Sequence, residues 1–222
     1  MLTTLDYMNI FHETKNSITL INSSLQLIAK NHPEVTGYEF WDETVQELSY
    51  LKELIAELSQ SRVGYPLNLC PVDIYAFTSE ILDSIRSLSE NQNFSCKTNI
   101  EENLPSVFID SLRIKQALIN LLKNAYEAMD RTGTVQLNIY RKDDFLQMDI
   151  IDFGGGIPDN IKDTLFDIFA TSKEYGTGLG LPITRQIIEE HSGKLLYESR
   201  PGDGCTFSIL LPLNPSTRST QK

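Results

Sequence analysis

Asp152-Phe153-Gly154-Gly155-Gly156 follows a stretch of alternating apolar residues, and Gly176-Thr177-Gly178-Leu179-Gly180 leads into a predicted helix. An aspartate at the end of a strand can accept a hydrogen bond from a nucleobase amine, and glycines let the backbone approach a flat ring. Backbone N–H groups at the start of a helix, aided by the helix dipole, bind phosphate. Each glycine cluster by itself is also compatible with an ordinary turn, so the other motifs in the chain must decide between a nucleotide site and a turn.

Asn120 and Asn124 lie upstream and, being four residues apart, share one face of a predicted helix. Asparagine is a poor helix former and its amide is costly to bury, so a polar pair beside an apolar stripe requires an explanation. A side-chain carbonyl suits magnesium, which binds few protein groups and keeps water and phosphate in the rest of its shell. Taken alone, the pair is better explained as exposed surface. Its position ahead of the two glycine clusters instead favours a nucleotide site.

Residues 5–62 have the pattern of two helices. Apolar or small residues recur at alternating spacings of three and four, first at Phe11, Thr14, Ile18, Ile21, Leu25 and Ile28, and then at Thr44, Leu48, Leu51, Ile55 and Leu58. Residues 31–37 contain Pro33 and Gly37, which end the first helix and turn the chain. Two helices bury little apolar surface, so two such hairpins are expected to pair into a four-helix bundle, making the protein a homodimer. The alternative is a monomer whose hairpin packs on its own C-terminal half.

Beyond residue 65 the pattern changes to mixed strands and helices. Alternating apolar positions predict strands over 65–70, 94–100, 106–109, 135–140, 145–152, 194–199 and 205–211, and helical spacing predicts helices over 73–90, 111–129 and 179–190. Asp73 and Asp110 are the expected N-caps of the first two helices. We therefore expect an α+β fold, with a helical layer on one mixed sheet. The expected division is a hairpin at 1–62, a sandwich domain at 63–213 and a polar tail at 214–222.

Composition excludes several classes of protein. The chain has 222 residues, of which 41% are hydrophobic, so disorder of the whole chain is excluded. Its formal charge of −11 argues against binding to nucleic acid or anionic membranes. No apolar run is long enough for a membrane span, and no export signal opens the chain. Cys70, Cys96 and Cys205 fit reduced thiols, so a cytoplasmic protein is expected.

Four motifs in this order resemble the N, G1, F and G2 boxes of sensor histidine kinases. They are the asparagine pair, the Asp152 motif, the phenylalanines of Leu165-Phe166-Asp167-Ile168-Phe169, and the second glycine cluster. The resemblance covers about residues 65–212. It implies the α/β sandwich shared with gyrase and the mismatch-repair ATPases, which binds Mg-ATP under a mobile lid. Gyrase-like hydrolytic ATPases carry a glutamate where this chain has Asn120, so the resemblance disfavours a hydrolytic ATPase.

The resemblance also implies roles for the motif residues. Asn124 would ligate magnesium, Asn120 would lie beside the phosphates, and Asp152 would bind the adenine amine while Gly154 and Gly156 let the base approach. The lid hinge and the phosphate-facing helix end would be formed by Gly176, Thr177, Gly178, Leu179 and Gly180. In the short lid, Lys173 either reaches the γ-phosphate or is an ordinary solvated lysine.

A kinase also needs a phosphate acceptor, and His12 is the candidate. It lies one residue past the stripe position Phe11 and is followed by Glu13 and Asn16, which resembles the H box of the commonest histidine kinase class. Carried over, His12 accepts the phosphoryl group, Glu13 is the general base, and Asn16 orients water for dephosphorylation of a response regulator. His32, in the predicted turn, and His191, at a helix end where a partial positive charge is favourable, are expected to be structural.

The resemblance therefore implies a kinase that phosphorylates its own histidine with Mg-ATP and passes the phosphoryl group to an aspartate of a response-regulator receiver domain. One alternative is a catalytically weak phosphotransfer or scaffold protein, and another is an anti-sigma-type serine kinase, which would lack the hairpin. The chain departs from the family where Ser17 replaces a usual proline, so a helix kink is expected to be weaker. Since 11 residues precede His12, the expectation is a transmitter core whose sensor is missing or is a separate partner.

Overall fold

The computed structural model describes residues 4–60, 66–88, 94–171 and 177–213, except for the side chains of residues 4–12, 50, 53, 54, 56–60, 86–88 and 94. The chain divides into two compact units: Met1–Tyr65 with Ile168–Leu179, and Pro66–Asp167 with Gly180–Lys222. Two helices come first in the chain, and the elements that follow form an α+β arrangement, which is the predicted fold class.

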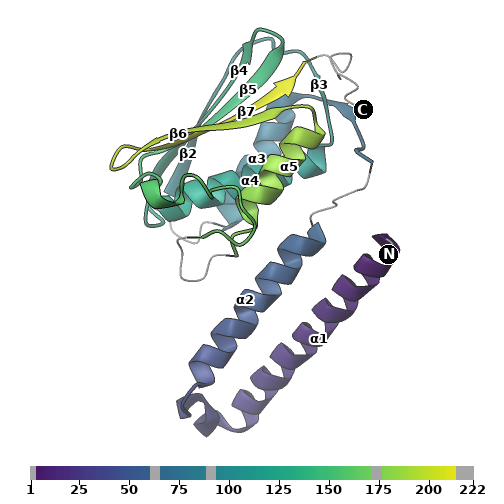
Figure 1. Cartoon of the computed structure of the whole chain (residues 1–222), viewed down its shortest axis with the longest axis vertical. Helices are drawn as coiled ribbons and strands as arrows, with labels where there is room; N and C mark the ends of the chain where they lie inside the picture. Colours follow the sequence, from purple (N-terminus) through teal and green to yellow (C-terminus); the bar gives the residue numbers. More distant parts are fainter. Residues whose placement is uncertain (1–3, 61–65, 89–93, 172–176, 214–222) are drawn as a thin grey trace. The chain divides into compact units, whose positions relative to one another are not determined.

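The N-terminal segment is a helical hairpin (Figure 1). Helix α1 spans Thr4–Asn31, a short 3-10 helix η1 spans Pro33–Gly37, and helix α2 spans Trp41–Gln60. The two long helices pack against each other, and Ile18 and Ile55 are buried. The two predicted helices and the break between them are thus confirmed.

One side of α1 carries apolar residues that the hairpin does not cover. Leu20, Ile21, Leu27 and Ile28 are 43–69% exposed, and their spacing of i, i+1, i+7 and i+8 places them together along the helix. We call these four residues the α1 flank. An unpartnered apolar strip of this kind is typical of a helix that packs against a further partner.

None of the helices in the described ranges is both long and apolar enough to cross a membrane.

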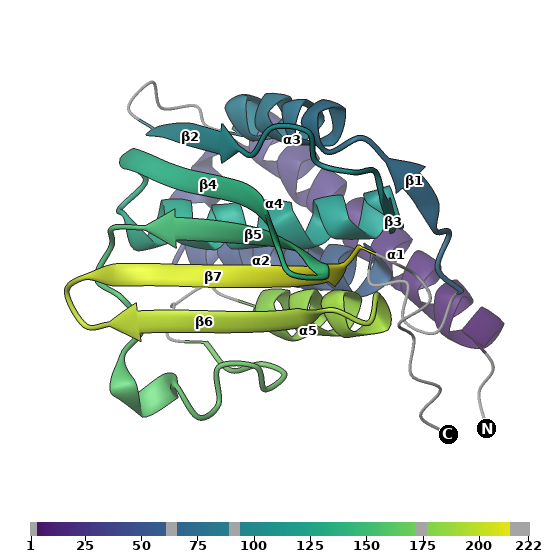
Figure 2. The ribbon, with the colours of Figure 1, turned by 90° about the horizontal axis from the view of Figure 1, so that it is seen from above.

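The second unit is built on a five-stranded mixed sheet in the order β2-β4-β5-β7-β6 (Figure 2). Its strands are β2 Phe94–Ile100, β4 Gly133–Lys142, β5 Phe145–Asp152, β6 Lys194–Arg200 and β7 Gly204–Pro212. Only the β2–β4 pair is parallel among these strands. A separate antiparallel pair is formed by β1 Cys70–Val72 and β3 Val107–Ile109. The central strands β5 and β7 place Asp152 directly opposite Cys205.

Three helices cover one face of this sheet: α3 Ile74–Leu88, α4 Ser111–Ala128 and α5 Gly180–Glu190 (Figures 1 and 2). The core lies between the two layers, because alternate strand residues such as Leu137, Met148 and Ile209 are fully buried. The predicted caps are confirmed. The Asp73 carboxylate accepts from the N–H of Ala76 at 2.9 Å, and the Asp110 carboxylate accepts from the N–H of Arg113 at 3.3 Å.

Three parts of the sandwich differ from the sequence prediction. The one mixed sheet that was expected is divided in two, because β1 and β3 pair with each other apart from the five-stranded sheet. The strand expected over residues 65–70 begins only at Cys70, and before it the N–H of Asn68 donates to the Asp110 carboxylate at 3.1 Å rather than to a strand. The side chain of Asp110, which is distant in sequence, is therefore the hydrogen-bond partner of this segment in place of a neighbouring strand. The 3-10 turn η2 at Asp159–Ile161 was not predicted and follows Pro158, whose fixed φ favours a turn.

Candidate functional site

Asp152 ends β5 and is buried. Its Oδ1 accepts from the N–H of Gly154 at 3.0 Å and from the N–H of Cys205 at 3.2 Å. Burial raises the pKa of the Asp152 carboxyl, and these two backbone donors counteract part of that increase. Among the described residues the hydrogen bonds of this carboxylate end on Oδ1, and Oδ2 accepts none of them.

Three of the glycines around Asp152 are required by the packing of the chain itself, whereas a side chain at Gly155 would meet open space. A side chain at Gly154 would collide with the carbonyl of Ala128 at the end of α4, and one at Gly204 would collide with the carbonyl of Asp152. Gly156 has a φ of +73° and lies against the carbonyl of Arg200. Gly204 was not singled out from the sequence. The signal available there was the Gly202-Asp203-Gly204 spacing just before the predicted strand at 205–211.

Asn120 lies on the face of α4 that packs against α5. Its Nδ2 donates to Oγ1 of Thr184 at 2.8 Å, and its amide lies so close to Gly180 that a side chain there would collide with it. Asn124 follows one turn later on the same face and is half-buried. The pair is thus more than exposed surface. Thr184, which holds the amide of Asn120, was not singled out from the sequence.

The described ends of the predicted lid are tied to each other. The N–H of Phe169 donates to the carbonyl of Gly178 at 3.0 Å, and Gly178 has a φ of +64° with no room for a side chain. The N–H of Leu179 points to Oγ1 of Thr177 at 3.4 Å. Lys173 and Gly176 lie outside the described residues.

The first F-box phenylalanine is held by aromatic and cationic neighbours. The ring of Phe166 meets Tyr197 edge-on at 5.9 Å, and the guanidinium of Arg185 on α5 lies 5.2 Å from its centroid. The segment that leads into the lid is therefore anchored to α5 and β6.

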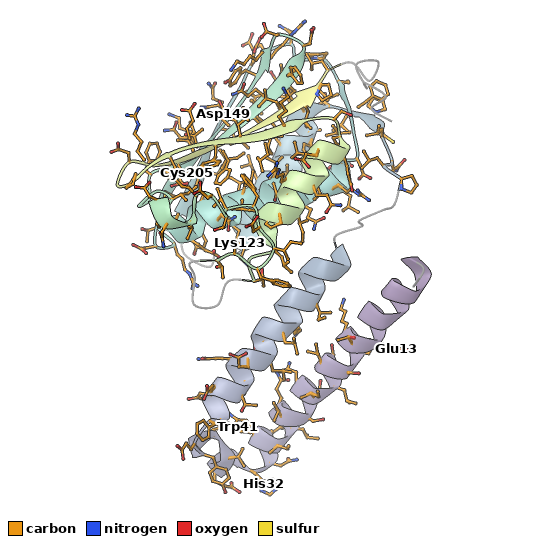
Figure 3. The ribbon with its side chains drawn as sticks, in the orientation of Figure 1. Glu13, His32, Trp41, Lys123, Asp149 and Cys205 are labelled. Carbon is orange, nitrogen blue, oxygen red and sulfur yellow. The ribbon has the colours of Figure 1, made fainter. Side chains whose placement is uncertain are left out.

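In the hairpin, the backbone of His12 lies in α1, and its side chain is outside the described part. Glu13 is exposed on the same helix (Figure 3). Asn16 is exposed one turn further along it. Helix α1 continues through Ser17, whose hydroxyl donates to the carbonyl of Glu13 at 2.9 Å, a bond that proline cannot make. No break occurs at the position of the family's proline.

The two remaining histidines have different surroundings. His32 is exposed in the turn beside Glu34, 3.1 Å away (Figure 3). His191 is buried, and burial lowers its pKa. This buried position fits the structural role expected of His191, although burial disfavours the positive charge that the helix end would favour.

No cluster of three or more His, Cys, Asp or Glu side chains in the described ranges could hold a metal ion. Magnesium that arrives with a nucleotide needs only one or two protein oxygens, because phosphate and water complete its shell. Asn124 is half-buried, and the oxygen of its amide is a hard donor of the type that suits this role.

Residues 109–215 match the family model described as histidine kinase-, DNA gyrase B- and HSP90-like ATPase. The sensory histidine kinase/phosphatase NtrB of Rhodobacter capsulatus is 33% identical over 92% of this chain and 60% of its own length. The catalytic domain of histidine kinase ThkA is 32% identical over 68% of this chain and 99% of that domain, with a TM-score of 0.60. ThkA in complex with the response regulator TrrA is 26% identical over 95% of this chain and 61% of that chain, with a TM-score of 0.69.

The chain spans 33–60% of the length of three further curated relatives, two of them named as histidine kinases and the third as a sporulation kinase.

Proposed function

Because the chain belongs to the histidine kinases, we propose that it uses Mg-ATP to phosphorylate His12 and passes the phosphoryl group to an aspartate of a response-regulator receiver domain. The observation that carries this proposal is the anchored carboxylate of Asp152, which keeps one oxygen for an adenine amine. The complex of ThkA with TrrA supports a receiver domain as the partner.

On the ATP side, Asp152 selects the base, and Gly154 and Gly156 keep the backbone close enough for the ring to enter. Asn120 keeps the start of α5 in place beside the phosphates, and Asn124 holds magnesium. Magnesium bound there would neutralise charge on the phosphate oxygens. The proposed lid and phosphate contacts of Lys173, Gly176, Thr177, Gly178, Leu179 and Gly180 rest on the sequence motif.

On the acceptor side, neutral imidazole of His12 attacks the γ-phosphorus through Nε2 while Glu13 accepts the Nδ1 proton as general base. The bond from the γ-phosphorus to its bridging oxygen breaks, and ADP leaves with the electron pair. Positioning and charge neutralisation supply most of the rate in such a transfer. Glu13 is exposed and adjacent in sequence, which supports its role.

The same hairpin is proposed to dephosphorylate the regulator, with Asn16 orienting the attacking water. Kinase and phosphatase activities would then require different placements of the domain at 63–213 relative to the hairpin at 1–62. The kinase/phosphatase name of NtrB supports this dual activity.

Self-phosphorylation is tested by incubating the whole chain with Mg and γ-labelled ATP. We expect a protein-bound label that is stable to alkali and labile to acid, because a phosphorus–nitrogen bond hydrolyses in acid. An acid-stable label would indicate a serine kinase, and binding of ATP with no label would indicate a scaffold protein. Either result would overturn the proposal.

We also propose a homodimer that buries the α1 flank in a four-helix bundle. Replacing Ile21 and Ile28 together with Lys is expected to weaken self-association by at least about 100-fold, because two charges would enter an apolar interface. Analytical ultracentrifugation measures this. Replacing Thr19 and Gln26, exposed on another side of α1, adds the same charge and should leave the dimer intact. Equal dissociation of both variants would argue against this interface.

A further inference from the structure

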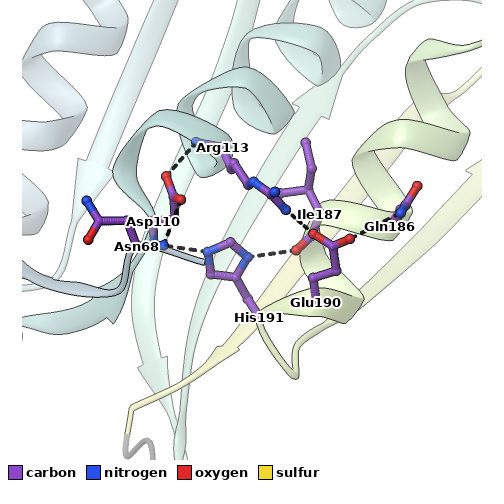
Figure 4. A network of polar contacts seen from close by, with 7 residues as sticks. All are labelled: Asn68, Asp110, Arg113, Gln186, Ile187, Glu190 and His191. Atoms are coloured by element: carbon purple, nitrogen blue, oxygen red, sulfur yellow. Dashed lines mark hydrogen bonds and ion pairs between the residues drawn. The ribbon is translucent and has the colours of Figure 1, made fainter. Parts of the chain in front are cut away.

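A buried polar network joins the beginning of α4 to the end of α5 (Figure 4). The N–H of Asp110 donates to Nε2 of His191 at 3.0 Å, and Nδ1 of His191 lies 2.7 Å from the carbonyl of Ile187. Because Nε2 accepts, it carries no proton, and Nδ1 must be the nitrogen that donates. The imidazole is thus neutral, with both nitrogens bonded. Its lowered pKa agrees with this assignment.

Charged groups strengthen this contact between the beginning of α4 and the end of α5, which we call the junction. Arg113 on α4 forms an ion pair with Glu190 on α5, and Nε2 of Gln186 donates to the same carboxylate at 3.1 Å. Asp110 caps α4 and also accepts from the N–H of Asn68, in the segment that follows the hairpin. Three segments distant in sequence therefore meet at this point, which is outside the nucleotide site.

The same two helices also meet at the opposite end of α5. There Asn120 packs on Gly180 and donates to Thr184. Since His191 follows the last residue of α5 and Gly180 is its first, α5 is held at both ends against α4. A shift of α5 along α4 would move both ends together.

We propose that His191 is a positioning residue. Together with the Arg113–Glu190 pair it fixes α5 along α4, and it thereby fixes the position of Gly180 beside Asn120 for phosphate binding. This inference rests on the proposed function. A neutral imidazole suits the task because one rigid ring bonds both the N–H of Asp110 at a helix start and the carbonyl of Ile187 in a last turn, which also accepts from the backbone N–H of His191. An apolar residue would leave the N–H of Asp110 buried without this partner.

The test compares His191→Phe with Thr78→Val in the whole chain. Thr78 on α3 is also buried and donates to the carbonyl of Ile74 at 2.7 Å, so its loss removes a buried hydrogen bond without touching the junction. Equilibrium titration with Mg-ATP at pH 8 should give an affinity about tenfold weaker for His191→Phe, because small displacements of binding groups are costly. Thr78→Val should bind like the wild type, although both variants melt at lower temperature.

Equal affinities of His191→Phe and the wild type would overturn the inference, and so would an equal loss in Thr78→Val. If the wild type itself does not bind Mg-ATP, the proposed function fails instead, and the inference falls with it.

Should His191→Phe not fold, pH supplies a second test through His191→Gln, whose amide oxygen can accept from the Asp110 N–H. The charged groups facing His191 are Asp110 and Glu190, which favour its protonation, and Arg113, which opposes it. The pKa of His191 in the folded protein lies below 6.5. The junction is therefore intact above pH 6.5 and is lost as the pH falls through the folded pKa. Wild-type affinity should fall over this range relative to His191→Gln. Parallel pH profiles would refute the role.

Discussion

Asp152→Asn is expected to weaken Mg-ATP binding by about 100-fold, because a hydrogen bond to a buried charged group is replaced by a clash of donors. The amide oxygen of the variant can still accept from the N–H groups of Gly154 and Cys205, which hold Oδ1 in the wild type. Its NH₂ group then takes the place of Oδ2 and faces the adenine amine. The fold is retained while the base-binding group changes from acceptor to donor.

The same variant should change base preference. Inosine triphosphate carries a carbonyl oxygen where ATP carries the amine, so it accepts from the asparagine and is repelled by the aspartate. Competition titrations of both nucleotides should show that the wild type prefers ATP and that Asp152→Asn loses or inverts this preference. A variant that binds both nucleotides as the wild type does would exclude Asp152 from base recognition.

Asp149→Asn is the matched control. Asp149 lies on the same strand but accepts from Tyr140, Gln147 and Ser208 on the sheet face away from the core. Its substitution disturbs a polar network of similar size without reaching the nucleotide site. Nucleotide affinity and base preference should therefore be unchanged, and a change there would show that general damage to the sheet explains the result.

The parts of this fold that were predicted correctly are those set by local periodicity. The alternation of apolar residues predicted the bounds of β2 and β5, and the carboxylates of Asp73 and Asp110 predicted where two helices begin. The residues missed are those defined by contacts across the chain. His191 meets Asp110 across 81 positions, and Thr184 meets Asn120 across 64, which no pattern of spacing reveals. Desolvation of His191 was hidden for the same reason, since burial depends on neighbours that only the fold brings together.

The glycines illustrate a second limit of sequence reasoning. For Gly154 and Gly156, the prediction was that glycine is needed because a base must approach the backbone there. In the structure, the carbonyls of Ala128 and Arg200 already occupy the space that side chains there would need. Packing of the chain thus already requires glycine at the positions for which base access was proposed. Substituting these glycines would disturb the fold as well as nucleotide binding. A substitution of Asp152 therefore reports more directly on nucleotide binding.

His12→Ala is expected to reduce incorporation of the γ-phosphate label to background while Mg-ATP affinity stays that of the wild type. The acceptor nitrogen is removed, but His12 lies outside residues 109–215, the segment that matches the ATPase family. Alanine is the best helix former, so α1, which spans Thr4–Asn31, should remain intact. Label incorporation and nucleotide titration on the same preparation separate loss of the acceptor from loss of the nucleotide site.

His32→Ala controls for the removal of a histidine from the hairpin. His32 is exposed in the turn, and its ring bonds locally to Glu34, two positions further on, so its loss should leave labelling unchanged. Persistence of an acid-labile label in His12→Ala would exclude His12 as the acceptor, and the remaining candidates would be His32 and His191. His191 is a weak alternative, because both its ring nitrogens are bonded inside the sandwich. A label surviving in His12→Ala and lost in the double variant with His32→Ala would therefore move the phosphorylated histidine to the hairpin turn.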